Sequence, residues 1–172
     1  CAAGATYSGL NLPACPQLWV ATYSTCGLAG HTSDWRHTLV KGVGVDLVNL
    51  PEFRRLCDDF GTHGEKDVRL ANAFVRRTFT AAELSQACGR HDPCEFLAGR
   101  FAAKEAVFKA VAPQTAVGFD LRAVETLDAP TGQPVVTLTG AIAPALAEAG
   151  VASVLVSITN ECDYVCAFAL AQ

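Results

Sequence analysis

A single long helix, beginning after Asp92 and extending to about Ala112, leaves few folds open to this chain. Asp92 is a favoured N-cap residue, Pro93 is favoured at the first helical position, and the Glu95 carboxylate can bond back to the cap. Pro113 ends the helix, because proline cannot supply the hydrogen bond that a helix interior requires. One face carries a stripe that is apolar except for one lysine: Leu97, Phe101, Lys104, Phe108 and Val111.

Residues 42–48 alternate in polarity and predict a strand. Val43, Val45 and Leu47 share one face, and Asp46 lies on the other. Aspartate is depleted in strands, so its presence here is unusual. It is either a carboxylate held on a rigid element for a function or a charge at an exposed sheet edge, and the strand pattern leaves both open.

The rest of the chain predicts further helices and strands. The helices are predicted over about 52–60, over about 67–77, from a capping box at Thr80 onward, and over about 141–149. The strands are predicted over 119–127, 134–139, 151–159 and 163–170. Because most strands follow the helices, we predict an α+β fold in which an antiparallel sheet packs against helices, including the long one.

The composition is that of a folded chain of 172 residues, of which 51% are apolar and 17% are charged. It excludes disorder over the whole chain, and no apolar run is long enough to span a membrane. The net charge of −4 argues against nucleic acid as a partner. Ten of the thirteen Lys and Arg residues lie between Arg54 and Lys109. They form either a basic surface for an anionic ligand or acidic partner, or a solvated helix face.

The N-terminal part differs from the rest, because residues 1–33 contain no Asp, Glu, Lys or Arg. We therefore predict an extension of unknown role over residues 1–40 and a folded domain over residues 41–172. The first residue is Cys1 rather than Met, as expected for a fragment or a processed chain.

The eight cysteines include no CxxC pair. The run that best resembles a metal site, Cys88, His91 and Cys94, lacks a fourth ligand nearby, so zinc is not favoured. We expect reduced thiols and a cytoplasmic location.

Four charged residues cluster on the long helix. Glu105 and Lys109 are one turn apart on one edge of the stripe, and Arg100 and Lys104 lie along the other edge. An ordinary surface ion pair would account for Glu105 and Lys109, whereas the crowding of four charges favours a functional site. The chain has no GxxxxGK[ST] or GxGxxG motif, so a bound phosphate would have to be held by side chains and a metal ion.

Five segments, in matching order, resemble the 4′-phosphopantetheinyl transferases of the holo-[acyl-carrier-protein] synthase type. They are Val43-Gly44-Val45-Asp46, Phe79-Thr80, the helix motif from Phe96 to Ala110 (FLAGRFAAKEAVFKA), Gly132-Gln133-Pro134 and Ser157-Ile158-Thr159. The resemblance spans about residues 42–170, and the helix motif is very specific. The same motif occurs in transferase domains fused to large fatty acid synthases.

The resemblance implies that the chain transfers 4′-phosphopantetheine from coenzyme A (CoA) to a serine of an apo acyl carrier protein, which releases adenosine 3′,5′-bisphosphate. The catalytic residues would be Asp46 and Glu105, which hold Mg²⁺, and Lys109, which lies near the pyrophosphate. The CoA contacts would be Arg100, Lys104, Gly132, Pro134 and Asn160. A water held by the metal or by Glu105 would take the serine proton.

Asn160 departs from the family, which usually has a histidine at this position. An amide can donate a hydrogen bond to a phosphate oxygen but carries no charge. The resemblance therefore implies either weaker CoA binding or compensation by another cation. The segment 61–69 is longer than the family pattern, which would alter carrier choice.

Carrier proteins of this kind are acidic helical bundles, and the predicted docking residues are Arg54, Arg55, Arg76 and Arg77. Free-standing family members are trimers with active sites between subunits, so the resemblance also implies a homotrimer. The carrier, whether for fatty acid or polyketide synthesis, is not defined by the sequence. Two alternatives stay open: an inactive module with a structural or CoA-binding role in a multidomain synthase, and a small nucleotide- or CoA-binding domain without transfer activity.

Overall fold

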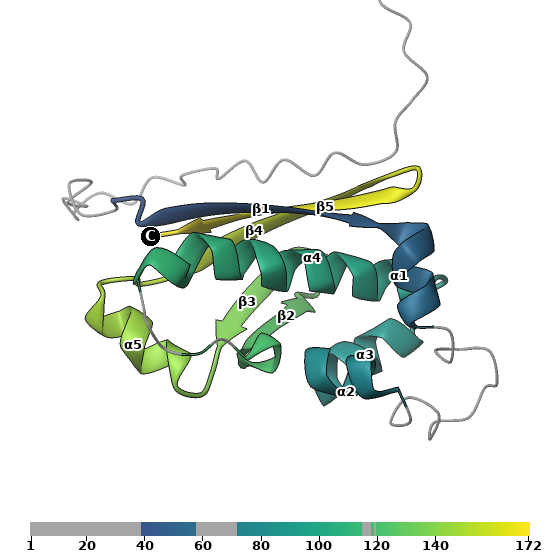
Figure 1. Ribbon diagram of the computed structural model, residues 1–172, viewed down its shortest axis with the longest axis horizontal. Helices are drawn as coiled ribbons and strands as arrows, with labels where there is room; N and C mark the ends of the chain where they lie inside the picture. The colour runs from purple at the N-terminus through teal and green to yellow at the C-terminus, as the bar shows by residue number, and fades with distance from the viewer. Residues whose placement is uncertain (1–38, 58–71, 115–117, 119) are drawn as a thin grey trace, which may run out of the picture. The chain divides into compact units, whose positions relative to one another are not determined.

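The computed structural model describes residues 39–57, 72–114, 118 and 120–172, so the predicted extension lies almost wholly outside the described residues. In chain order the helices and strands are β1 (Gly42–Asn49), α1 (Leu50–Leu56), α2 (Ala73–Thr78), α3 (Ala81–Cys88), α4 (Pro93–Val111), β2 (Val124–Asp128), β3 (Pro134–Leu138), α5 (Ile142–Glu148), β4 (Val154–Glu161) and β5 (Tyr164–Ala171). The 3₁₀ helices within the described residues are η3 (Ala112–Gln114) and η4 (Leu121–Ala123). The predicted α+β class is confirmed (Figure 1).

The strands form two separate antiparallel sheets. β1, β5 and β4 make a three-stranded sheet in that order, and β2 pairs only with β3. A two-residue turn at Cys162 and Asp163 joins β4 to β5, and Cys162 has the positive φ, 51°, that such tight turns favour. α4 runs along one face of the three-stranded sheet, with the β2–β3 hairpin on its other side (Figure 1). The long helix is therefore covered from two directions.

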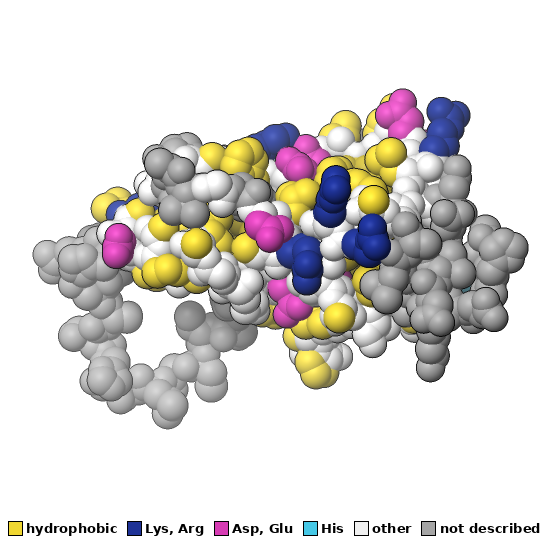
Figure 2. All heavy atoms as spheres, turned by 60° about the horizontal axis from the view of Figure 1, so that its bottom comes forward, with side chains coloured by type: hydrophobic (Ala, Val, Ile, Leu, Met, Phe, Trp, Pro, Cys, Tyr) yellow, Lys and Arg dark blue, Asp and Glu magenta, His cyan; other side chains and the backbone are white. Residues whose placement is uncertain are grey.

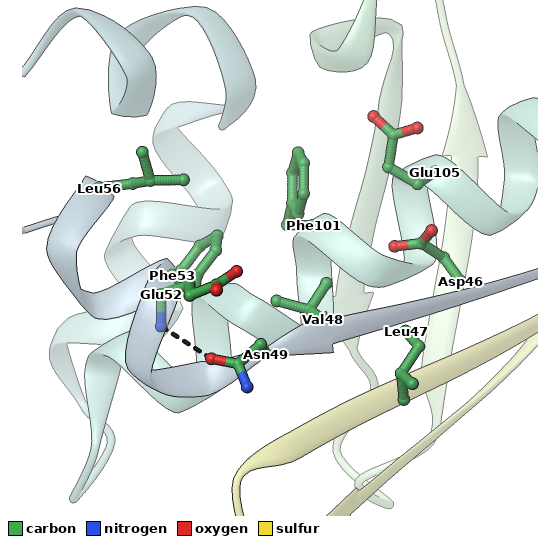
Figure 3. A pocket seen from close by; sticks show the side chains of 9 residues that line it. All are labelled: Asp46, Leu47, Val48, Asn49, Glu52, Phe53, Leu56, Phe101 and Glu105. Carbon is green, nitrogen blue, oxygen red and sulfur yellow. Dashed lines mark hydrogen bonds between the residues drawn. The ribbon is translucent and has the colours of Figure 1, made fainter.

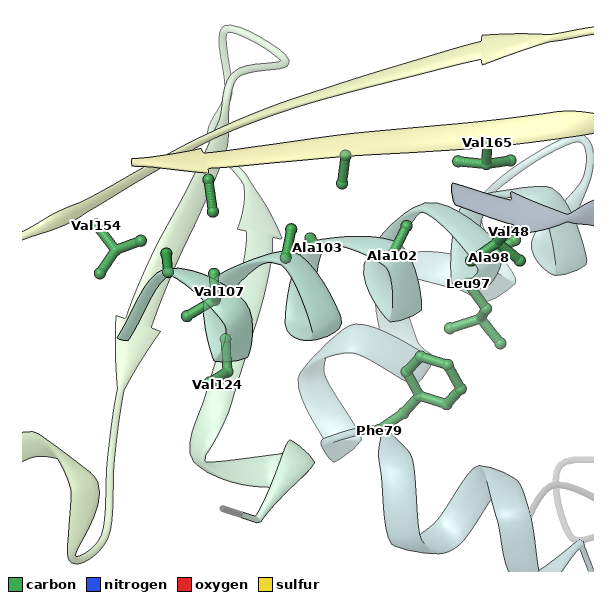
Figure 4. Packing of buried hydrophobic residues seen from close by; sticks show 14 of the residues in the cluster. Val48, Phe79, Leu97, Ala98, Ala102, Ala103, Val107, Val124, Val154 and Val165 are labelled. Carbon is green, nitrogen blue, oxygen red and sulfur yellow. The ribbon is translucent and has the colours of Figure 1, made fainter. Parts of the chain in front are cut away.

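α4 begins as predicted, because Asp92 accepts hydrogen bonds from the backbone N–H groups of Cys94 and Glu95 at 3.1 and 3.0 Å. The Glu95 carboxylate, predicted to bond back to the cap, instead accepts from Asn160. The helix ends at Val111, and η3 follows it. The predicted stripe understates the buried surface, because the alanines on other faces are also buried (Figure 4): Ala98, Ala102, Ala103, Ala106 and Ala110.

β1 lies close to α4 because of two glycines. A Cβ atom at Gly42 would lie 1.9 Å from the carbonyl oxygen of Ala110, and one at Gly44 would lie 1.9 Å from that of Ala106. No other residue fits at either position unless the strand moves away from the helix. The face of β1 that meets α4 is therefore the face that carries Asp46.

The outer face of the three-stranded sheet is apolar and exposed in a single copy. The alternation along β1 places its valines and leucine there, and β5 and β4 add large side chains on the same side. The residues, 40–61% exposed, are Val43, Val45, Leu47, Leu155, Tyr164 and Phe168. An exposed apolar patch of this kind commonly marks an interface.

Four phenylalanine rings hold α1 and α2 against α4: Phe53, Phe74, Phe79 and Phe101. Their centroids lie 5.6–6.5 Å apart, and most pairs meet edge to face, which aromatic rings favour. This cluster fixes α1 beside the end of β1.

The start of β2 and the extent of the helices between Pro51 and Arg77 differ from the prediction or lie partly outside the described residues. The strand predicted over 119–127 begins only at Val124, because Asp120 caps η4 by accepting from the N–H of Arg122 at 2.9 Å. The helices predicted between Pro51 and Arg77 extend into residues 58–71, which lie outside the described residues. None of the helices in the described part is long and apolar enough to cross a membrane.

Candidate functional site

Three carboxylates, Asp46, Glu52 and Glu105, line one pocket of about 310 Å³. Asp46 comes from the helix-facing side of β1 and Glu105 from the adjoining side of α4, and Phe101 stands between them and α1 (Figure 3). The complete lining is Asp46, Leu47, Val48, Asn49, Glu52, Phe53, Leu56, Phe101 and Glu105. The structure thus brings the two predicted metal ligands together.

Lys109 joins this pair because it lies one helical turn beyond Glu105. Its Nζ donates to Asp46 Oδ1 at 2.7 Å and to the carbonyl oxygen of Val45 at 2.9 Å. Partial burial raises the pKa of Glu105, the charge of Asp46 raises it further, and Lys109 opposes both. Asp46 therefore disfavours the charged form of Glu105, and a cation beside both carboxylates would relieve this.

The donor set fits Mg²⁺. This ion prefers oxygen ligands, and proteins commonly bind it through one or two carboxylates while substrate phosphates and waters complete the shell. Asp46 and Glu105 are such a pair, held on a strand and a helix. Among the described residues no group of three or more His, Cys, Asp or Glu side chains could hold a metal ion, and this includes Cys88, His91 and Cys94. The pocket suits a metal shared with a phosphate-bearing substrate.

Arg100 lies in a second cluster, against the β2–β3 hairpin. It is almost fully buried, its guanidinium carbon lies 4.0 Å from the ring centroid of Phe96, and it donates to Asp128 Oδ1. Arg90 contacts the same ring at 4.8 Å and donates to Asp128 Oδ2. Burial lowers the pKa of Arg100, and Asp128 opposes this effect. The sequence analysis missed Asp128, since no local pattern connects it with the long helix.

Lys104 does not reach the surface, contrary to its predicted contact with CoA. Its side chain has no exposed area, and its Nζ lies 2.9 Å from Glu83 Oε1. The same ammonium donates to the carbonyl oxygens of Leu121, at 2.9 Å, and Val124. Because a ligand cannot contact an enclosed ammonium, the predicted phosphate contact of Lys104 is wrong for this structure. The sequence marked Glu83 only as part of a capping box, which the structure confirms.

The predicted residues fall on two sides of α4. Asp46 lies on β1, at one edge of the three-stranded sheet, and Asn160 lies on β4, at the other edge. Asn160 Nδ2 donates to Glu95 Oε1 at 2.5 Å. Gly132, with a φ of 84°, and Pro134 belong to the β2–β3 hairpin, whose strand β3 packs beside β4. In one copy, α4 therefore separates the predicted nucleotide contacts from the carboxylate pocket.

The predicted docking arginines lie on α1 and α2. Arg54 forms an ion pair with Asp92, which raises the pKa of Arg54 and lowers that of Asp92. Arg55, Arg76 and Arg77 are exposed and make no ion pair with another described residue. Figure 2 shows Lys and Arg side chains gathered near the middle of one face, with Asp and Glu side chains among them. The chain therefore has a small basic area on its surface although its net charge is −4.

The chain is similar to a known protein family and to individual members of it. Residues 42–169 match the family model of the 4′-phosphopantetheinyl transferase superfamily, a range that contains every predicted site residue. The holo-[acyl-carrier-protein] synthase of Desulforudis audaxviator is 38% identical over 133 residues, which are 77% of this chain and 93% of the relative.

Solved structures agree with the sequence relatives. The holo-[acyl-carrier-protein] synthase of Neisseria meningitidis matches with a TM-score of 0.64 and 32% identity, over 78% of this chain and 99% of that one. A Chronobacterium ammoniagenes ACPS–CoA complex matches with a TM-score of 0.61 and 29% identity, over 76% of this chain and 96% of that one.

Proposed function

Because the chain belongs to the holo-[acyl-carrier-protein] synthase type of the 4′-phosphopantetheinyl transferase superfamily, we propose that it converts an apo carrier protein to its holo form in a Mg²⁺-dependent reaction. A serine hydroxyl of the carrier attacks the β-phosphorus of CoA. The bond from that phosphorus to the bridging oxygen breaks, and adenosine 3′,5′-bisphosphate leaves. The observation that carries this proposal is the pocket shared by Asp46 and Glu105, with Lys109 bonded to Asp46.

Each residue of the pocket then has a role. Asp46 and Glu105 would hold Mg²⁺, which when bound neutralises negative charge that develops on the pyrophosphate oxygens. Lys109, whose Nζ bonds Asp46, would donate to the departing phosphate. Glu105 lines the pocket and would hold the water that accepts the serine proton.

We also propose that the active form is a homotrimer. Two observations support association: one copy leaves a row of large apolar side chains exposed on its sheet, and one copy keeps Arg100 and Asn160 apart from the carboxylate pocket. In a trimer, the nucleotide contacts of one copy would complete the pocket of its neighbour. The family resemblance supplies the number of copies.

An acidic carrier would approach over α1 and α2. Arg55, Arg76 and Arg77 are exposed there and can steer the carrier by charge, whereas Arg54 already bonds Asp92 and should contribute less. We further propose a cytoplasmic location for the chain. A panel of apo carriers for fatty acid and polyketide synthesis would identify the physiological partner.

The test is intact-mass spectrometry of apo carriers incubated with this chain, CoA and Mg²⁺, beside an EDTA control. We expect a gain of one phosphopantetheine that EDTA abolishes. Glu105→Gln should lose this activity, because an amide is a poor Mg²⁺ ligand. Glu148→Gln, which makes the same change at an exposed position on α5, should keep it.

Two results would count against the proposal. Full activity of Glu105→Gln in Mg²⁺ would remove Glu105 as a metal ligand. No gain with any carrier, from a protein shown to be folded, would reject transfer and favour the inactive CoA-binding module.

A further inference from the structure

The edge of β2 that does not pair with β3 is bonded by side chains instead of by a strand. Three residues from α3 and α4 supply these bonds: Glu83, Gln86 and Lys104. Gln86 bonds both backbone groups of Asp128, accepting from its N–H and donating to its carbonyl oxygen, at 3.0 Å each. Glu83 Oε1 accepts from the N–H of Thr126 at 2.9 Å. Two helices therefore replace the missing strand.

Glu83 and Lys104 form the centre of this contact, and neither side chain has any exposed area. The second carboxylate oxygen of Glu83 accepts from the N–H of Thr80 at 2.8 Å. Lys104 directs its ammonium at Glu83 and at the carbonyl oxygens of Leu121 and Val124, so it has a partner for each of its three protons. A buried pair this fully bonded adds little stability over an apolar pair. Its bonds connect α3, α4 and the free edge of β2.

The hairpin needs this support. A two-stranded sheet is at best marginally stable alone, and β2–β3 pairs with no other strand of the described chain. Its turn carries Gly132 and leads to Pro134, and its strand β2 ends at Asp128, which faces Arg100. A shift of the hairpin along α4 would move all of these groups relative to Arg100.

We propose that Glu83 and Lys104 are positioning residues that hold the β2–β3 hairpin on α4 and thereby set the affinity for CoA without touching it. The inference rests on the proposed function, in which the hairpin turn borders the nucleotide. Loosening the hairpin should raise the Kd and KM for CoA at least about tenfold, because small displacements of binding groups have large effects. The KM for the carrier and kcat should change much less, since the carboxylate pocket lies on the other side of α4.

The decisive variant carries Glu83→Gln together with Lys104→Met. It removes both buried charges, keeps an oxygen to accept from Thr126, and leaves the carbonyl oxygens of Leu121 and Val124 without their donor. We expect it to stay folded, with a lower melting temperature because buried polar groups lose their partners, and to bind CoA at least about tenfold more weakly by calorimetry. Lys104→Met alone should be far less stable, because it leaves the Glu83 carboxylate buried without its cation.

Amide hydrogen exchange provides a readout that does not depend on activity. In the double variant, the amides of Thr126 and Asp128 should exchange faster while those of α4 keep their protection. Leu50→Ala, a core truncation at the start of α1 on the other side of α4, serves as the control and should leave both the hairpin amides and the CoA Kd unchanged.

Three outcomes would overturn the inference: wild-type CoA affinity in the double variant, unchanged hairpin exchange, or an equal loss of CoA affinity in Leu50→Ala. If the wild-type chain bound CoA but transferred nothing, the proposed function would fail. The exchange and calorimetry would still decide the role of the pair.

Discussion

At the scale of single residues, the position of Asp46 depends on residues that have no side chain. Gly42 and Gly44 let β1 approach α4 until a Cβ atom would lie 1.9 Å from a helix carbonyl oxygen. This contact brings the Asp46 carboxylate within 2.7 Å of Lys109 Nζ and into the pocket with Glu105. The glycines are therefore part of the site although they have no chemistry of their own.

Gly44→Ala should displace β1, destabilise the fold by about 1–3 kcal/mol and weaken Mg²⁺-dependent activity, because the added methyl group overlaps the Ala106 carbonyl. Gly89→Ala is the matched control: its φ is −88° and its Cβ would meet Gln86 O at an ordinary 3.6 Å. Urea unfolding and transfer rates of both variants test this. Equal behaviour of the two would show that the close contact does not matter.

At the scale of elements, α4 holds the site together through its first turn. The N-cap Asp92 bonds the first amides of the helix and also pairs with Arg54 on α1, so one carboxylate joins the docking helix to the helix that carries Glu105. Arg54 lowers the pKa of Asp92, which means that folding favours the ionised form. The stabilisation is present above the unfolded pKa of about 3.9 and is lost as the pH falls through the lower folded pKa.

Asp92→Asn should test this linkage, because asparagine caps a helix about as well but carries no charge. We expect the variant to be less stable than wild type by under about 1 kcal/mol near pH 7, and the difference to vanish in acid. Asp92→Ala should lose about 1 kcal/mol more, since it also removes the cap. Urea titrations from pH 3 to 7 measure the difference in the free energy of unfolding between wild type and Asp92→Asn. A difference that stays constant with pH would show that the Asp92 charge does not stabilise the fold.

Features of α4 and β1 with local sequence signals could be predicted, whereas features that depend on packing between elements could not. The start of α4 could be predicted because its signals are local, namely Asp92 and Pro93. The burial of Lys104 could not, since helical spacing tells which face a residue occupies but not what covers that face, and here Glu83 and β2 do. The alternation of residues 42–48 likewise predicted the strand β1 correctly, but it did not show which face of the strand packs against α4. Its apolar face is the outer one, because glycines rather than valines allow the closest approach to a helix.

At the scale of the whole molecule, the strand order separates the predicted site residues of one copy into two groups. The family resemblance implies which residues belong to the site, and only the strand order β1-β5-β4 shows that Asp46 and Asn160 lie at opposite edges of the sheet. Phe168, on the central strand, is 41% exposed on the outer face and pairs in register with Val45. In the proposed trimer this face would be buried, and separated halves of the site would meet across the interface.

Phe168→Glu should therefore dissociate the trimer and abolish transfer, because a charge would be buried in the apolar interface. Ala147→Glu adds the same charge at an exposed position on α5 and should leave assembly intact. Light scattering after size exclusion reports the mass of each. A wild-type chain that is active as a monomer would refute the trimer.

Mixing two inactive variants tests whether the site is shared. Glu105→Gln damages the carboxylate pocket, and Arg100→Met damages the nucleotide contacts. In randomly mixed trimers, one interface in four combines an intact Glu105 on one side with an intact Arg100 on the other, so up to about a quarter of wild-type activity should return. If mixed trimers form and no activity returns at any ratio, both halves of the site belong to the same copy.

The pairing of β1 has a consequence for how the protein is made. β1 is an edge strand, and its strand partner is β5, which spans residues 164–171. During synthesis on the ribosome, residues 42–49 therefore emerge more than a hundred residues before the strand that completes their sheet. Until then Asp46 has no fixed place beside α4, so a nascent chain that lacks β5 should also lack the proposed metal pocket.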